Sequence, residues 1–418
     1  MKGICLFAAQ ALLFGIEFAT GYWFNYFAGQ IPFDLRRYGG YFTKGIWGLC
    51  TLGTVQGVHG DHSSLLLING IIAALFLLLF AALFVFNIYD AYQMGKFQEE
   101  GESDGLAEEY GRSFARRLFP YLSLAPAIVL MLLLSLMPIL FSVLTAFTNY
   151  NGDHLPPASL FRWVGLQNFI NIVKVPVWSK TFFAVFLWTV IWTLAITFVS
   201  YFVALLQAQL LGSEYAKGSA VYRAIYILPW AIPGMVSLLV FRNLFNGQFG
   251  PVNQLLLNLH WIHSRIPFFT DPLLAKITII LVNVWLQFPP FMVMLIGVLA
   301  NQDPTLYDAA SIDGANHLQV FGRIKLPLLL HATSPLIIMN LAGNFNAFAS
   351  IYFLTGGGPT NTSYQFAGST DILISWIYKL TLNQQLYNMA AVMNLLIFAF
   401  IAAVSFWNFR RTTAFKEM

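Results

Sequence analysis

Apolar stretches, each close to the length of a membrane-spanning helix, set the limits on how this chain can fold. A helix needs about 20 apolar residues to cross about 30 Å of hydrocarbon. The chain is 58% hydrophobic and only 10% charged, whereas a soluble domain has about 25% charged residues. We therefore predict an all-α membrane protein with about eight transmembrane helices, at roughly 4–25, 64–89, 121–148, 182–210, 222–242, 273–299, 327–350 and 386–408.

The number and spacing of the charged residues, cysteines and histidines argue against nucleic-acid binding, a disulfide framework, a metal site and catalysis. The net charge of +4 is small and the basic residues form no stripe that could follow a phosphate backbone, so we expect no nucleic-acid partner. The two cysteines are too few for a disulfide framework. The pairs His59 with His62 and His260 with His263 lack further ligands nearby, so we expect no metal site. No catalytic triad or carboxylate pair can be assembled inside the spans, so we expect no enzyme.

A charged run divides the chain. Residues 91–120 contain KFQEEGESDGLAEEYGRSFARR, which is typical of a solvated helix or linker. We predict two N-terminal transmembrane helices with an external connection in residues 1–90, a charged cytoplasmic linker at 91–120, and a six-span core at 121–418. The pair Arg36 and Arg37 is unusual for an external connection, because basic residues favour the cytoplasmic side. The arrangement of that connection stays open.

The most structured polar segment lies between the sixth and seventh predicted spans, at residues 301–327. Asp303 followed by Pro304 predicts a helix start, since an aspartate can cap free amides and proline fits the first helical position. Gly314 can adopt the left-handed conformation that ends a helix, and Asn316 can cap a second short helix. The segment therefore predicts two short helices joined at a glycine elbow.

This segment resembles the EAA loop of ABC-importer permeases through its run DAASIDGANHLQVFGRIKLP. In that loop Glu-Ala-Ala is followed by a short spacer, Asp-Gly-Ala, and then Gln, Phe, Ile and Leu-Pro. Asp308 departs from the pattern because it stands where the family usually has glutamate, which keeps the charge on a stem one methylene shorter. The matching residues are Ala309, Ala310, Asp313, Gly314, Ala315, Gln319, Phe321, Ile324, Leu326 and Pro327.

The resemblance implies that residues 301–327 form a coupling helix that sits on a separate ATPase subunit at the cytoplasmic face. Small side chains would let its backbone lie close inside a groove of that subunit, and the aspartates would meet basic groups. ATP and Mg would then be bound by two ATPase subunits, and this chain would need no cofactor. Both termini are expected on the cytoplasmic side of the plasma membrane. The residues expected to couple are Asp308, Ala309, Ala310, Asp313, Gly314, Ala315, Gln319 and Phe321.

Further runs resemble the MalF-like permeases of bacterial ABC sugar importers of the maltose/maltodextrin type, among them NFNAFASIYFLTGGGPTN, AGSTDILISWIYK and GQFGPVNQLL. The likeness covers roughly residues 120–418 and implies a type I ABC importer permease core of six spans preceded by two extra spans. It implies a second homologous (MalG-like) permease subunit, two ATPase subunits and an extracytoplasmic solute-binding protein as partners. The glycines at 356–358 lack the Lys-Ser/Thr of a phosphate loop, so we expect a flexible external turn there.

Neutral amides beside aromatic residues occupy the sixth and seventh spans. Amides pair with hydroxyl groups and aromatic faces suit the C–H faces of a pyranose, which suggests a neutral oligosaccharide. Transmembrane amides also join helices, and both interpretations stay open. The resemblance implies seven sugar contacts, four of them changed from the family residue, so we expect a sugar other than maltose, or maltose in another pose. The seven are Asn283, Leu286, Gln287, Pro290, Gly343, Asn344 and Ala347.

The sequence thus predicts the permease subunit of an ATP-driven, binding-protein-dependent importer, which forms half of a translocation pathway and hydrolyses nothing itself. The alternative is a stand-alone ion-coupled carrier or a membrane-embedded glycan enzyme. Ion-coupled carriers usually place ionisable groups near the middle of the bilayer. Glu17 is the only carboxylate clearly inside an apolar stretch, which counts against the alternative.

Overall fold

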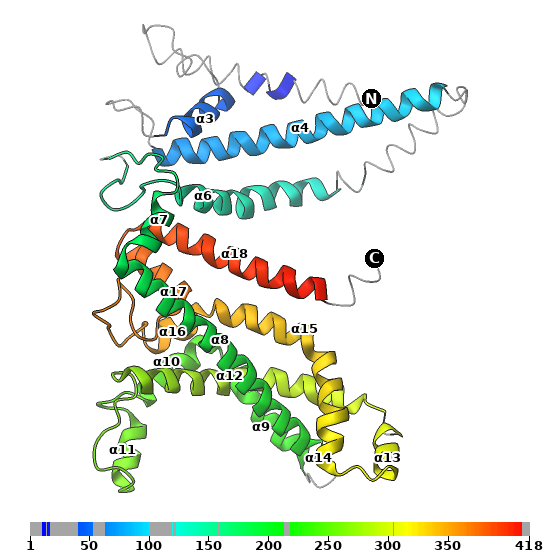
Figure 1. Ribbon diagram of the computed structural model, residues 1–418, viewed down its shortest axis with the longest axis vertical. Helices are drawn as coiled ribbons and strands as arrows, with labels where there is room; N and C mark the ends of the chain where they lie inside the picture. The colour runs from blue at the N-terminus through cyan, green and yellow to red at the C-terminus, as the bar shows by residue number, and fades with distance from the viewer. Residues whose placement is uncertain are drawn as a thin grey trace. The chain divides into compact units, whose positions relative to one another are not determined.

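A computed structural model shows that regular structure in the described part of the chain is helical (Figure 1). The only paired extended residues there are two isolated bridges, between Thr148 and Trp163 and between Thr360 and Gly368. The structure describes residues 11–13, 15–16, 41–52, 63–99, 119, 123–156, 159–212, 218–303 and 305–411.

The chain divides into two compact units. The first consists of Met1–Asn168 and Gln385–Leu395, and the second of Phe169–Gln384 and Leu396–Met418. The predicted boundary near residue 120 falls beside residues outside the described ranges and stays a prediction.

The first unit is built on the long helix α4. Short helix α3 and α6 both pack against α4, and their core includes Leu67, Ile71 and Phe161. The loop after α6 closes over this core, because the indole of Trp163 donates to the Leu49 carbonyl at 2.9 Å. The connection between the first two predicted spans therefore contains a helix that packs on the second span. The bounds are α3 Tyr41–Cys50, α4 Ser63–Glu99, π-helical η1 Leu132–Leu136 and α6 Met137–Thr145.

Glycines allow the close approach of α3 and α4. A Cβ atom on Gly70 would lie 2.8 Å from both the Gly45 carbonyl oxygen and the Leu49 Cβ. A Cβ on Gly45 would in turn lie 2.9 Å from the Asn69 carbonyl oxygen. Small residues at such crossings let helix backbones approach closely inside a membrane. The two helices can keep this spacing only while both positions lack a side chain.

Gly70→Val is therefore expected to push α3 off α4. Overpacking of a filled interface typically costs about 1–3 kcal/mol, so the thermal unfolding midpoint of the purified chain should fall by several degrees. Ala82→Val is the matched control, since Ala82 is exposed on the same helix. Equal midpoints for the two variants would contradict the close packing.

The second unit is a bundle in which α8 and α12 run in the same direction. Trp188 near the start of α8 packs with Ile279 near the start of α12, and Leu205 packs with Met292 farther along both helices. The bounds are α8 Pro176–Leu211, α9 Ser219–Ala231, α10 Gly234–Leu244, α11 Pro251–Asn258, α12 Pro272–Ala300, α13 Thr305–Ile312, α14 His317–Val320, π-helical η2 Phe321–Lys325, α15 Leu326–Phe345, α16 Phe348–Leu354, α17 Leu373–Tyr378 and π-helical η3 Lys379–Asn383. Helices α7 (Gln167–Lys174) and α18 (Tyr387–Arg411) contain residues of both units.

Among the described residues, five helices are long and apolar enough to cross a membrane, or six if one bent pair counts as a single span. The predicted span at 4–25 lies almost entirely outside the described residues, so a total of eight stays a prediction. The span at 386–408 corresponds to α18, whose apolar part is Tyr387–Ala403.

The span predicted at 222–242 is not one straight helix. Helices α9 and α10 meet there at an angle of 91°. The break falls at Ile232, which has an extended backbone (φ −88°, ψ 135°) and precedes Pro233. A proline disfavours helical geometry in the residue before it. The pair Ile232 and Pro233 in the sequence therefore predicts a bend at this point.

Candidate functional site

The segment 301–327 forms the expected elbow between two helices (Figure 1). The Asp303 carboxylate accepts a hydrogen bond from the Thr305 amide at 2.9 Å, and this bonding lowers the pKa of Asp303. At the other end of α13, the Ala315 amide donates to the Ala310 carbonyl and the Gly314 amide to the Ser311 carbonyl, at 3.0 and 3.1 Å. These two bonds define a Schellman cap around Gly314, whose φ is +76°.

The second helix of the elbow begins at a capping box. The Asn316 side chain accepts from the Gln319 amide and the Gln319 side chain accepts from the Asn316 amide, both at 2.9 Å. Gln319, predicted as a coupling residue, thus has a structural role at the helix start.

The prediction that this second helix is short and separate is wrong. Helix α14 continues through η2 into α15 as one helix, His317–Phe345. A proline inside a helix clashes with the carbonyl four residues earlier, and the wider π-helical turn lies where Pro327 would cause that clash. The elbow is therefore continuous with the membrane helix that follows it.

Most of the predicted coupling residues are accessible in this chain. Asp308, Ala309, Asp313, Gly314 and Gln319 are exposed. Ala315 and Phe321 are half-buried, and Ala310 is buried.

Two apolar side chains beside the elbow were not predicted as functional. Ile312 is 86% exposed and Leu318 is 82% exposed. Both side chains lie on the exposed side of the elbow, on either side of Gly314, where another protein could contact them.

Helix α13 is fixed to the base of α15. The Lys325 ammonium lies 4.5 Å from the centre of the Tyr307 ring, which is a cation–π geometry. The Tyr307 hydroxyl donates to the Gln302 side-chain oxygen, and burial raises the pKa of Tyr307. A displacement of α13 must therefore act on α15 through this contact as well as through the elbow.

Farther along the same bundle, polar side chains from α8, α12, α15 and α16 form what we call the polar belt. The Gln287 amide donates to the Asn344 side-chain oxygen at 2.7 Å, and the Asn344 amide donates to the Thr197 hydroxyl at 2.9 Å. The Ser350 hydroxyl donates to the Asn283 side-chain oxygen at 2.6 Å. The polar belt consists of Thr197, Asn283, Gln287, Asn344 and Ser350.

Two of the predicted sugar contacts join helices within the belt. Asn283 is 1% exposed and Asn344 is 4% exposed. The Asn283 amide also donates to the Ile279 carbonyl, and the Trp192 indole donates to the Asn344 carbonyl. Both asparagines therefore hold the bundle together, as transmembrane amides commonly do.

Gln287 differs from these asparagines because part of its bonding capacity is unused. Its Oε1 atom is buried and has no hydrogen-bond partner in the described part of the chain. Buried polar atoms are nearly always paired in folded proteins. An unpaired acceptor beside the bonded Asn344 amide group can accept from a buried water molecule, or from a ligand hydroxyl where a movement of the helices exposes it.

The remaining four predicted contacts lie around Gln287 at the surface of the bundle. Leu286, Pro290 and Ala347 are half-buried and Gly343 is exposed. Asn283, Gln287 and Pro290 follow one another at helical spacing on α12, so they share a face. Of the seven predicted contacts, the structure joins only Gln287 and Asn344 directly by a side-chain hydrogen bond.

Comparison with known proteins gives the family. Residues 210–413 match the family described as the binding-protein-dependent transport system inner membrane component. The chain is 39% identical over 380 residues to the galactooligosaccharides transport system permease protein GanP of Bacillus subtilis, covering 91% of this chain and 90% of the relative. It is 36% identical over 409 residues to the maltodextrin permease MdxF of the same organism, covering 96% and 92%. The chain belongs to the MalF-like permeases of ABC sugar importers.

A solved structure supports the same fold. A bacterial ABC transporter that imports the acidic polysaccharide alginate contains a chain that matches with a TM-score of 0.56 and 20% identity, covering 72% of this chain and 96% of that one. As a MalF-like permease, this chain is a non-catalytic, multi-pass subunit of the plasma membrane. Its roles in docking and in sugar recognition are considered next.

Proposed function

We propose that this permease carries a neutral oligosaccharide and docks an ATPase subunit through residues 301–327. The observation that carries the proposal is the unbroken helix His317–Phe345, which joins the exposed elbow to Asn344 of the polar belt. A movement imposed on the elbow can reach the belt along this one helix, which contains the π-helical turn η2 and Pro335. The chain would form half of the pathway, and a second homologous permease subunit the other half.

The elbow has the chemistry of a docking surface. Ile312 and Leu318 offer apolar contacts, and Asp308 and Asp313 offer exposed carboxylates for basic groups of the partner. ATP and Mg would be bound by two ATPase subunits, with no cofactor in this chain. The elbow would face the cytoplasm together with both termini, and an extracytoplasmic binding protein would deliver the sugar to the opposite end.

The polar belt supports a neutral substrate. In the described part of α8, α12 and α15 the belt contains amides and hydroxyls and no carboxylate or basic group. The relatives GanP and MdxF are named for galactooligosaccharides and maltodextrin. The Gln287 Oε1 atom is buried without a partner among the described residues, so it is the belt acceptor that would take a sugar hydroxyl once a movement of the helices exposes it.

The test is sugar-stimulated ATP hydrolysis and uptake in proteoliposomes that contain this chain with its co-expressed genomic neighbours. We expect oligosaccharide uptake that depends on ATP and on the binding protein. Uptake by this chain alone, driven by a sodium or proton gradient, would contradict the proposal and favour an ion-coupled carrier.

Gln287→Leu is expected to raise the sugar concentration for half-maximal uptake about tenfold, because a lost hydrogen bond to a buried polar group is worth about 1–2 kcal/mol. The change also leaves the Asn344 side-chain oxygen unpaired. Leu281→Ala is the control, since Leu281 lies exposed on the same helix outside the belt. If both variants need the same sugar concentration for half-maximal uptake, Gln287 does not contact the sugar.

A further inference from the structure

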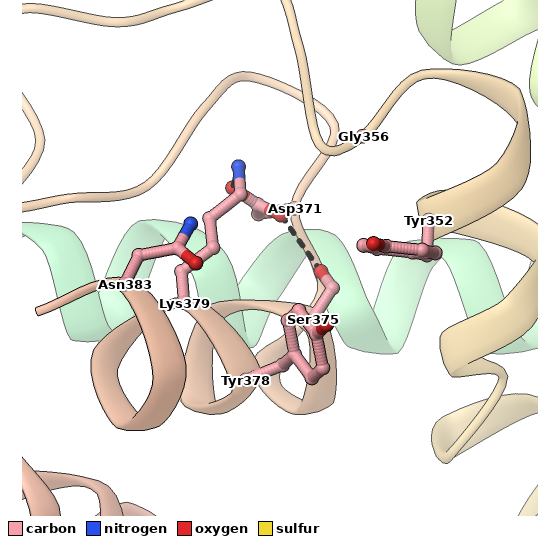
Figure 2. Close-up of a pocket in the computed structure, with 7 residues that line it drawn as sticks. All are labelled: Tyr352, Gly356, Asp371, Ser375, Tyr378, Lys379 and Asn383. Atoms are coloured by element: carbon pink, nitrogen blue, oxygen red, sulfur yellow. Dashed lines mark hydrogen bonds and ion pairs between the residues drawn. The ribbon is translucent and has the colours of Figure 1, made fainter. Parts of the chain in front are cut away.

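A polar cavity lies in the loop that follows α16, away from the polar belt. It has a volume of about 140 Å³ and is lined from α16, the turn at Gly356, α17 and η3. Figure 2 shows Tyr352 on one side of this cavity, and Lys379 and Asn383 on the other. A cavity of about 150 Å³ can hold one benzene-sized ring, so this one has room for a single six-membered ring.

The cavity lies at the end of the bundle opposite to residues 301–327. The Gln365 amide donates to the Thr181 hydroxyl in the first turns of α8, whereas the elbow follows the last residue of α12, which runs parallel to α8. If the elbow is cytoplasmic, as proposed above, the cavity opens on the side from which sugar arrives.

The walls of the cavity combine aromatic faces with hydrogen-bonding groups. The Tyr352 and Tyr378 rings lie 5.2 Å apart in an edge-to-face arrangement, and Phe348 packs against both. Tyr352 is 40% exposed, so its ring is open to a ligand. Asn383 is exposed across the cavity and supplies an amide that donates and accepts.

The charges in the cavity balance each other. The Asp371 side chain is fully buried and forms an ion pair with the Lys379 ammonium, which is 24% exposed. Asp371 also accepts from the Gly368 amide at 2.7 Å and from the Ser375 hydroxyl at 2.8 Å. Burial raises the pKa of Asp371, and the Lys379 charge opposes that rise. Asp371 thus positions Lys379, and the site has no net charge that would select an anion.

The site is also held rigid. The Leu373 amide donates to the Thr189 hydroxyl and the Trp376 indole donates to the Gln365 carbonyl. The short helix α16 carries both Tyr352 and Ser350, and Ser350 bonds Asn283 in the polar belt. The residue that would hold the ligand, Tyr352, is therefore two positions from the belt residue Ser350 on the same helix.

We infer that this cavity is an outer binding site for one pyranose ring of a neutral oligosaccharide, stacked on Tyr352 and hydrogen-bonded by Lys379 and Asn383. The inference rests on the proposed function for its sidedness and substrate class. The outer site holds the sugar before it enters the polar belt. Helix α16 contributes Tyr352 to the outer site and Ser350 to the belt.

The experiment is saturation-transfer NMR of maltotriose with the full chain in lipid nanodiscs. Tyr352→Leu and Asn383→Ala are each expected to weaken binding about tenfold, because each removes an aromatic or hydrogen-bonding contact with the sugar. Tyr352→Phe keeps the ring and should bind like the wild type. Leu382→Ala, exposed beside Asn383 and outside the cavity lining, is the second control.

The outcomes separate the two proposals. Wild-type binding that Tyr352→Leu and Asn383→Ala leave unchanged, or no binding at all, would overturn the outer site, even if the assembled importer transports sugar. Tyr352-dependent binding in a protein that imports no sugar would overturn the proposed function and retain the site. Tighter binding of a uronic acid trisaccharide than of maltotriose would overturn the assignment of a neutral ligand.

Discussion

Gly314→Val is expected to abolish sugar-stimulated ATP hydrolysis in the assembled importer while the chain still inserts into the membrane. Gly314 has a φ of +76°, and a left-handed backbone costs a residue with a Cβ about 1–2 kcal/mol, with more for a branched side chain. A Cβ at this position would meet no atom within 4 Å. The effect would therefore come from the backbone alone, which would leave the Schellman cap and move α13 from its docking position.

The series Gly314→Asn, Gly314→Ala and Gly314→Val provides the control. Asparagine tolerates the left-handed conformation better than other residues that have a Cβ, so stimulated hydrolysis should fall in that order. Membrane insertion and yield should be the same for all three. Coupling that is intact in the valine variant would show that the elbow does not depend on the left-handed glycine.

Gly357→Ala is expected to destroy the loop that contains the outer cavity. A Cβ on Gly357 would overlap the Asp371 carboxylate and the Lys379 ammonium, so their ion pair would have to separate. Breaking a buried ion pair by displacing one partner costs about 3–5 kcal/mol. The thermal unfolding midpoint of the chain should fall sharply, and maltotriose binding should be lost.

Gly356→Ala is the matched control for this change. Gly356 is also left-handed, with a φ of +60°, but a Cβ there would meet no atom within 4 Å. Its cost should be limited to the backbone strain of about 1–2 kcal/mol. Two variants with the same midpoint would show that the contact between Gly357 and Asp371 contributes nothing to stability.

The elbow could be predicted from sequence because its causes are local. The caps at Asp303, Gly314 and Asn316 each join groups that are two to five residues apart in the chain. Side-chain types at fixed spacing therefore determine the caps. The length of the second helix was harder to predict, since it depended on a π-helical turn that accommodates Pro327.

The roles of the belt amides could not be predicted from sequence. Asn283 and Gln287 lie one turn apart on α12, and the same two explanations applied to both. Asn283 meets Ser350, which is 67 residues away, whereas Gln287 keeps one buried acceptor unpaired. Only the packing of α12 against α15 and α16 shows that both amides join helices, and that Gln287 also keeps one acceptor without a partner among the described residues.

The glycine-rich turn makes a contact that the sequence does not reveal. A flexible external turn is predicted at 356–358, because the glycines lack the Lys-Ser/Thr of a phosphate loop. In the structure Gly357 is buried against Asp371. Asp371 lies 14 positions later in the chain, so no local sequence pattern predicts this contact. Because the Asp371 carboxylate occupies the space of a Cβ atom, position 357 must be glycine.

If residues 301–327 dock an ATPase subunit as proposed, the unbroken helix from the elbow to Asn344 connects that docking site to the polar belt. The 29 residues of this helix follow a path of about 43 Å at 1.5 Å per residue. The path changes direction along its course (Figure 1) and contains the π-helical turn η2 and Pro335, but the helix is not interrupted. If docking of the ATPase shifts the bond between Asn344 and Gln287, sugar at Gln287 must change the affinity of the elbow for the ATPase by the same factor. Bound sugar would then promote docking of the ATPase subunit, and a transporter without sugar would hydrolyse less ATP.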